Sequence, residues 1–142
     1  MIALVDIGNT RTKFCLENQG NRGVVTSVAN ELLSTDYFTA NFSGVEKLIV
    51  ASVSRNELTE RIQYWCDKYN IAYQQVVTEK QKNEVVSAYS VPSQLGVDRW
   101  LTLLATNALY PNKNVLIVDA GTATTIDILS CNGQHLGGWI LA

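Results

Sequence analysis

Two segments of the chain carry the same arrangement of groups that could bind a phosphate. Residues 2–16 and 115–129 each run from four apolar residues into Asp-x-Gly, a short polar cluster and a second apolar stretch. Glycine lets the backbone bend and lets a phosphate approach the amides without a Cβ in the way. A carboxylate beside a polyphosphate needs a divalent cation between them, so Asp6 implies magnesium. Two such bends facing each other would form a clamp for a metal-bound polyphosphate.

The first bend offers neutral donors from Asn9, Thr10 and Thr12, and Lys13 adds a positive charge one strand step further on. For one such bend alone, a hairpin turn in which Asp and Asn are simply turn formers explains the residues equally well. The repeat favours the functional interpretation, because self-similarity at long range indicates a duplicated supersecondary unit. Each copy is predicted to be a β-hairpin.

The second bend, residues 119–125, has more hydroxyl groups and no lysine, which suits outer phosphate oxygens or a weakly bound cation. Asp127 lies on the strand that follows and is expected to face solvent rather than to act in catalysis. His135, the only histidine, is expected in a surface turn, because no Ser or Cys is placed to form a triad with it. The apolar surroundings of the tryptophans predict core positions for Trp65, Trp100 and Trp139.

A third cluster of polar residues is Gly96-Val97-Asp98-Arg99, at a predicted helix start. From spacing alone, helix capping is the preferred interpretation of Asp98. The alternative is that the Asp98 carboxylate accepts the proton of a substrate hydroxyl while the Arg99 guanidinium holds an anionic group bidentately.

Composition restricts the possible function classes. A chain of 142 residues with 46% apolar and 17% charged residues predicts an ordinary globular protein, with one domain as the default. The net charge of −2 without a basic cluster argues against nucleic-acid binding. No stretch approaches the roughly 20 apolar residues of a membrane span. The odd number of cysteines, without a C-x-x-C pair, favours reduced core thiols in a cytosolic protein.

The remaining pattern predicts strand, helix, strand order with a parallel crossover. Strands are expected at 24–28, 48–53 and 71–77, a short helix and loop at 29–46, and an irregular segment at 78–96. A capping box at 54–57 is expected to start one helix, and a second helix is expected at 98–109. The buried helical residues are predicted to be Leu58, Ile62, Trp65, Cys66 and Tyr69 in the first helix, and Trp100, Leu101, Leu104 and Ala108 in the second.

Three blocks resemble, in the same order, the signature blocks of type III pantothenate kinase, a family of the acetate and sugar kinase, Hsp70 and actin superfamily. They are D-I-G-N-T-R-T-K at 6–13, A-Y-S-V-P-S-Q-L-G-V-D-R at 88–99 and D-A-G-T-A-T-T-I-D at 119–127. G-G-W-I at 137–140 follows where that family has a glycine pair. The resemblance implies an α/β, ribonuclease H-like ATPase fold with a mixed sheet flanked by helices. A complete actin-like lobe would span 1–112, and a second lobe would begin at 113–142 but be truncated.

The resemblance also implies a role for individual residues. Asp98 would be the catalytic proton acceptor, which overturns the capping interpretation, and Asp119 would bind an activating monovalent cation, K⁺ or NH₄⁺. The residues implied in ATP and phosphate binding are Asp6, Ile7, Gly8, Asn9, Thr10, Arg11, Thr12, Lys13 and Thr122. The residues implied in substrate binding are Tyr89, Gly96, Val97, Asp98 and Arg99.

The implied activity is ATP-dependent phosphorylation of pantothenate to 4'-phosphopantothenate, the first step of coenzyme A biosynthesis. Mg²⁺ and a monovalent cation would be the cofactors, and a cytoplasmic homodimer would be the full-length form. The alternatives are a related kinase of another small hydroxylated substrate, or a non-catalytic regulatory accessory factor of the same family. Because the second copy is incomplete, weak or undetectable turnover is expected from the truncated chain.

Overall fold

The amino-terminal hairpin lies at the centre of the first of two units into which the chain folds. The computed structural model describes residues 1–53 and 57–142, and the two units are Met1–Val76 and Val77–Ala142. The lobe boundary predicted at residue 112 stays a prediction. The capping box predicted at 54–57 falls mainly on residues outside the described part of the chain.

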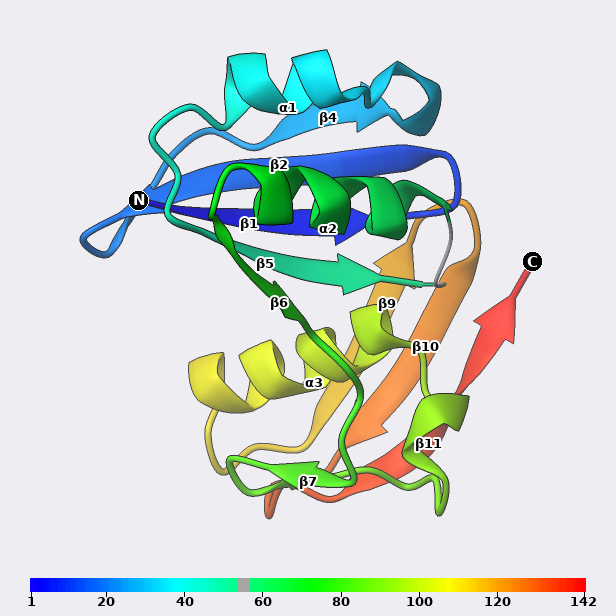
Figure 1. Cartoon of the computed structure of the whole chain (residues 1–142). Helices are drawn as coiled ribbons and strands as arrows, with labels where there is room; N and C mark the ends of the chain where they lie inside the picture. The colour runs from blue at the N-terminus through cyan, green and yellow to red at the C-terminus, as the bar shows by residue number, and fades with distance from the viewer. Residues whose placement is uncertain (54–56) are drawn as a thin grey trace. The chain divides into compact units, whose positions relative to one another are not determined.

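The first unit is built on a mixed sheet of six strands with the order β3-β2-β1-β5-β6, in which β4 also pairs with β2. β1 is antiparallel to β2 and parallel to β5, and β5 is parallel to β6. The strands are β1 (Ile2–Ile7), β2 (Arg11–Asn18), β3 (Asn21–Arg22), β4 (Thr26–Ala29), β5 (Lys47–Ser52) and β6 (Ala72–Gln75). The helices are η1 (Asn30–Leu32), α1 (Thr35–Asn41) and α2 (Glu57–Lys68), and α2 makes the predicted crossover between parallel β5 and β6 (Figure 1).

The core of the first unit lies between one face of this sheet and the two α-helices. Alternate residues of β1 are buried there, as a strand covered on one face requires. An aromatic cluster fills the space, with the Phe14 and Phe42 ring centroids 5.1 Å apart and those of Phe38 and Trp65 5.9 Å apart. Burial raises the pKa of the Cys66 thiol in this core to about 11, and Asp67 adds to the shift. The predicted core position is therefore confirmed for Trp65 and Cys66.

The second unit is built on the antiparallel sheet β11-β10-β9, with α3 packed on β10 and a small β7–β8 hairpin against α3. Its elements are β7 (Gln81–Lys82), β8 (Val85–Val86), η2 (Pro92–Gln94), α3 (Val97–Leu109), β9 (Val115–Ala120), β10 (Thr124–Leu129) and β11 (His135–Leu141). The segment expected to be irregular thus contains a short hairpin. The core of this unit gathers Val85, Leu95, Trp100, Leu103 and Leu129.

Several predicted core positions are wrong in the second unit. Leu103 is fully buried, whereas Ala108 is exposed, because the inward face of α3 is rotated from the predicted one. Trp139 is 62% exposed, since its neighbour Gly138 faces the α3 side of the sheet and successive strand residues point to opposite faces. Cys131 is exposed in the turn before β11 rather than a core thiol. No helix in the described ranges is both long and apolar enough to span a membrane.

Candidate active site

The first Asp-x-Gly bend joins β1 to β2 and is stabilised by hydrogen bonds with one asparagine, Asn30. Asp6 pairs with Lys13 and Ile7 with Thr12 across the hairpin, and the Gly8 amide donates to the Arg11 carbonyl at 2.9 Å. Four residues, 8–11, therefore make the bend. Asp6 and Lys13 are exposed on the sheet face opposite the core, and Asn9 and Thr10 are exposed at the tip.

Asn30, which the sequence patterns did not single out, binds this bend at three points. Its amide Nδ2 donates to the Gly8 carbonyl at 2.9 Å, and its backbone N–H donates to the Thr10 carbonyl at 3.0 Å. Its Oδ1 accepts from the Thr12 hydroxyl at 2.7 Å. Thr12 is therefore committed to shaping the bend. The Arg11 guanidinium donates to Ser27 of β4, through Nε to the hydroxyl at 2.9 Å.

The second Asp-x-Gly bend joins β9 to β10 and is one residue shorter. Asp119 pairs with Thr125 and Ala120 with Thr124, so that residues 121–123 make the bend. The Gly121 amide donates to the Ala123 carbonyl at 3.1 Å. Asp119 and Thr122 are exposed. The convergence of the two bends on one nucleotide stays a prediction, because each unit is described by itself.

Asp98 lies in the first turn of α3, after the N-cap residue Gly96, so the predicted helix start is confirmed. Its carboxylate is exposed and lies back over Gly96: a Cβ added to Gly96 would come within 2.6 Å of the Asp98 Oδ1. Gly96 thus leaves the space that the carboxylate occupies. Val97 is buried and anchors the turn in the core.

Arg99, next to Asp98, forms a buried two-point ion pair with Asp127 of β10. The guanidinium donates from Nε to Oδ2 at 2.9 Å and from Nη2 to Oδ1 at 2.7 Å. Arg99 is 6% exposed and Asp127 is 3% exposed. The prediction that Asp127 faces solvent is therefore wrong. In the sequence, a single charged residue on a strand looks like a surface residue. The cost of removing the Asp127 carboxylate from water is offset only by its ion pair with Arg99 on α3.

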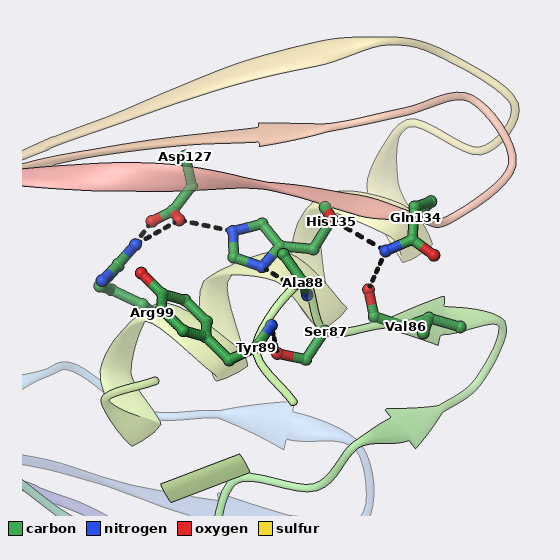
Figure 2. Close-up of polar contacts among 8 residues, drawn as sticks. All are labelled: Val86, Ser87, Ala88, Tyr89, Arg99, Asp127, Gln134 and His135. Atoms are coloured by element: carbon green, nitrogen blue, oxygen red, sulfur yellow. Dashed lines mark hydrogen bonds and ion pairs between the residues drawn. The ribbon is translucent and has the colours of Figure 1, made fainter. Parts of the chain in front are cut away.

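His135 is fully buried at the start of β11, so the prediction of a surface turn is also wrong. Its Nε2 lies 2.7 Å from Asp127 Oδ1, and its Nδ1 accepts from the Ala88 amide at 3.2 Å (Figure 2). Because an amide can only donate, Nδ1 is the unprotonated nitrogen and Nε2–H donates to Asp127. The ring therefore links β10 to the segment that carries Tyr89.

Tyr89 lies between these groups. The Arg99 Cζ is 5.9 Å from the Tyr89 ring centroid, and the His135 ring centroid is 6.0 Å from it. Lys80 fixes the same segment by donating to the carbonyls of Ser87 and Tyr89 at 2.7 and 2.9 Å. Two of the residues implied in substrate binding, Tyr89 and Arg99, are thus brought together with Asp127 and His135 in one network.

Opposing influences act on the pKa of Asp127. Burial favours the neutral acid and raises the pKa, but the hydrogen bonds from Arg99 and His135 and the positive charge of Arg99 lower it, and the net direction is downward. The hydrogen bond with Asp127 raises the pKa of Arg99 against the opposing effect of burial. The pair is therefore charged on both sides around neutral pH.

The two glycines at 137–138 have separate explanations, the backbone conformation of the first and the ion pair beside the second. Gly137 has a φ of +111°, a left-handed conformation that side chains rarely adopt. A Cβ on Gly138 would clash with the Ile126 carbonyl and the Asp127 carboxylate and would lie 2.7 Å from Arg99 Nη2. Gly138 therefore leaves the space in which the ion pair lies.

Comparison with known proteins agrees with this architecture. A solved Sinorhizobium meliloti protein, assigned as a candidate 2-dehydro-3-deoxygalactonokinase, superposes with a TM-score of 0.61 at 12% identity, over 99% of this chain and 53% of that one. The likeness shows the fold alone: mixed α/β sheets with helices.

The family model of type III pantothenate kinase matches residues 2–142, and the chain belongs to this family. The type III pantothenate kinase of Colwellia psychrerythraea is 51% identical over 142 residues, which cover 100% of this chain and 57% of the relative. That of Pseudoalteromonas translucida is 39% identical, over 99% of this chain and 56% of the relative. The chain therefore spans little more than half the length of these curated relatives.

Proposed function

We propose that this chain forms part of an enzyme that transfers the γ-phosphoryl group of ATP to the primary hydroxyl of pantothenate. The product, 4'-phosphopantothenate, would enter coenzyme A biosynthesis. The observation that carries the proposal is the family match over residues 2–142, which includes an exposed Asp98 at the start of α3.

In the proposed reaction, the pantothenate hydroxyl oxygen forms a bond to the γ-phosphorus, and the bond from that phosphorus to the bridging oxygen of ATP breaks. Asp98 accepts the hydroxyl proton, a contribution typically of about 10²–10⁴-fold in rate. The position of Asp98 favours this role, because its carboxylate is exposed whereas its neighbours Val97 and Arg99 are buried and hold the turn in place. Phosphoryl transfer otherwise depends mainly on positioning and charge neutralisation.

The first bend would contribute phosphate binding through Gly8, Asn9, Thr10 and Lys13. Asp6 suits Mg²⁺, which proteins bind through one or two carboxylates together with substrate phosphates rather than through a full protein cage. No group of three or more His, Cys, Asp or Glu side chains among residues 1–53 and 57–142 could hold a metal by itself. The donor set thus fits a metal that arrives with the nucleotide, where it would neutralise phosphate charge.

The second bend would contribute Asp119 to a monovalent cation and Thr122 to ATP. An exposed carboxylate with neighbouring hydroxyl and carbonyl oxygens is a suitable donor set for a hard cation. We include in the proposal a complete first lobe at 1–112, a partial second lobe from 113, a homodimer in the longer protein and a cytoplasmic location. The 57% coverage of the Colwellia relative supports the partial second lobe.

The direct test is formation of ADP and phosphopantothenate from ATP and pantothenate, in protein that carries this sequence at the length of its relatives. Asp98→Asn should abolish turnover and leave ATP binding intact. Unchanged turnover in this variant would remove Asp98 from the mechanism. A panel of other small hydroxylated substrates separates pantothenate from the related-kinase alternative. DNA binding at moderate salt, measured by anisotropy, would instead support the regulatory alternative.

A further inference from the structure

We propose that Asp127 and His135 are positioning residues of the substrate site, which hold Arg99 and the Tyr89 segment in the arrangement that receives pantothenate. This inference rests on the proposed function. The sequence predicts a solvent-facing Asp127 and a surface-turn His135, and neither is among the residues that the resemblance implies in substrate binding. Both are buried and both face the residues implied in substrate binding.

The orientation of Arg99 depends on Asp127. An arginine side chain has five N–H donors in a rigid plane, and Asp127 accepts from two of them, on the Nε and Nη2 edge. Nη1 is not among these donors, and Arg99 also has a side-chain hydrogen bond with Tyr89, which contributes to the raised pKa of the guanidinium. Two parallel bonds fix the plane as well as the position of the group. Asp127 thus decides which way Arg99 presents its remaining donors.

The position of Tyr89 depends on His135. The His135 Nδ1 accepts from the amide of Ala88, the residue before Tyr89, and the adjacent Gln134 donates through Nε2 to the Val86 carbonyl at 3.3 Å (Figure 2). The same imidazole donates through Nε2 to the carboxylate that holds Arg99. One ring therefore sets the spacing between the Tyr89 segment and the Arg99 plane.

Gly138 provides an independent observation that this arrangement excludes other side chains. A Cβ at Gly138 would occupy space filled by the Ile126 carbonyl, the Asp127 carboxylate and Arg99, whereas a Cβ at Gly137 would meet nothing within 4 Å. Gly138→Ala should therefore displace the ion pair. Gly137→Ala should strain only the backbone of β11, because of the positive φ. These two adjacent substitutions form a matched pair.

The first experiment tests the network in the 142-residue chain and does not depend on activity. Because His135 is the only histidine, its ring nitrogens give a single set of signals in a long-range ¹H–¹⁵N spectrum. We expect the tautomer with the proton on Nε2, and an Arg99 Nε–H signal that shifts in Asp127→Asn. A proton on Nδ1 instead of Nε2 would overturn the inference.

The second experiment measures KM for pantothenate and for ATP in the active kinase. Asp127→Asn and Gly138→Ala should raise KM for pantothenate by roughly 10–100-fold, as displaced positioning groups do, and leave KM for ATP unchanged. Gly137→Ala should lower the melting temperature without changing either KM. His135→Gln keeps a donor near Nε2 and His135→Asn keeps an acceptor near Nδ1, so each isolates one of the two contacts of the ring.

The outcomes separate the two proposals. Wild-type protein that phosphorylates pantothenate, with variants that lose stability but keep the wild-type KM for pantothenate, would overturn the positioning role and leave the function standing. Wild-type protein that shows the expected tautomer but does not phosphorylate pantothenate would overturn the proposed function, and the substrate role of the network with it. If Asp127→Asn fails to fold, Gly138→Ala against Gly137→Ala decides the question.

Discussion

The hairpins β1–β2 and β9–β10 arise from the same sequence pattern but differ in register. Aligned through their Asp-x-Gly bends, Val5 corresponds to Val118 and Phe14 to Asp127. The first bend takes four residues and the second takes three. A shift of one residue moves a whole strand face to the other side of the sheet. Val5 is accordingly buried, whereas Val118 is 58% exposed.

The second strands of the two hairpins keep the same inward position but fill it differently. Phe14 is packed among aromatic rings in the first unit, and Asp127 occupies the corresponding place in an ion pair with Arg99 in the second. The first hairpin thus has its bend fixed by Asn30, and in the second hairpin the buried Asp127 binds Arg99 and His135. The two hairpins therefore share the Asp-x-Gly bend and differ in the residues that support it.

The largest expected effect comes from removing the charge that distinguishes the second hairpin. Asp127→Ala leaves Arg99 buried without its partner, and such losses cost about 3–5 kcal/mol in the free energy of unfolding. Replacing both partners, as Arg99→Met with Asp127→Leu, should recover much of that loss. Urea denaturation of the single and double variants measures the difference. Equal instability of the two would show that the ion pair is not what supports β10.

Acid should weaken the second hairpin selectively. The folded pKa of Asp127 lies below its unfolded value of about 3.9, so the carboxylate stabilises the fold fully above that value. This contribution is lost as the pH falls through the folded pKa. The difference in unfolding free energy between wild type and Asp127→Asn should therefore be constant near neutral pH and shrink below about pH 4. A difference that grows on acidification would reverse the direction assigned here.

Removing the support of the first bend should have a smaller effect. Asn30→Ala takes away the side-chain bonds to the Gly8 carbonyl and the Thr12 hydroxyl, each worth about 1 kcal/mol net. We expect a loss of roughly 1–3 kcal/mol in stability and a higher KM for ATP, with KM for pantothenate unchanged. Asn41→Ala removes an asparagine bond within α1 and serves as the control. A pantothenate-specific effect of Asn30→Ala would contradict the proposed role of the first bend in ATP binding.

The smallest expected effect comes from removing the positive charge of Lys13, which lies opposite Asp6 in the first hairpin. Lys13→Thr puts a threonine opposite Asp6, as Thr125 stands opposite Asp119 in the second hairpin. A cross-strand pair of opposite charge contributes less than about 1 kcal/mol, so thermal unfolding should hardly change. KM for ATP should rise if Lys13 contacts phosphate. An unchanged KM would leave Lys13 as an ordinary surface residue.

The sequence alone determined the local elements, because their causes are local. The apolar runs became β1, β5 and β10, the parallel crossover through α2 follows from strand, helix, strand order, and both bends form hairpins at their glycines. The motif blocks also identified the family, because their order and spacing are specific. The individual strands, helices and bends depend on residues within a few positions of one another.

Only the tertiary structure decided the register of the second hairpin, the burial of Asp127 and His135, and the exposure of Trp139. The two burials could not be predicted because each depends on a partner far along the chain. Arg99 lies 28 residues from Asp127, and Ala88 lies 47 residues from His135. A charged residue is stable inside a protein only when it is paired with an opposite charge or a hydrogen-bond partner. A local sequence pattern does not show whether a distant residue forms that pair.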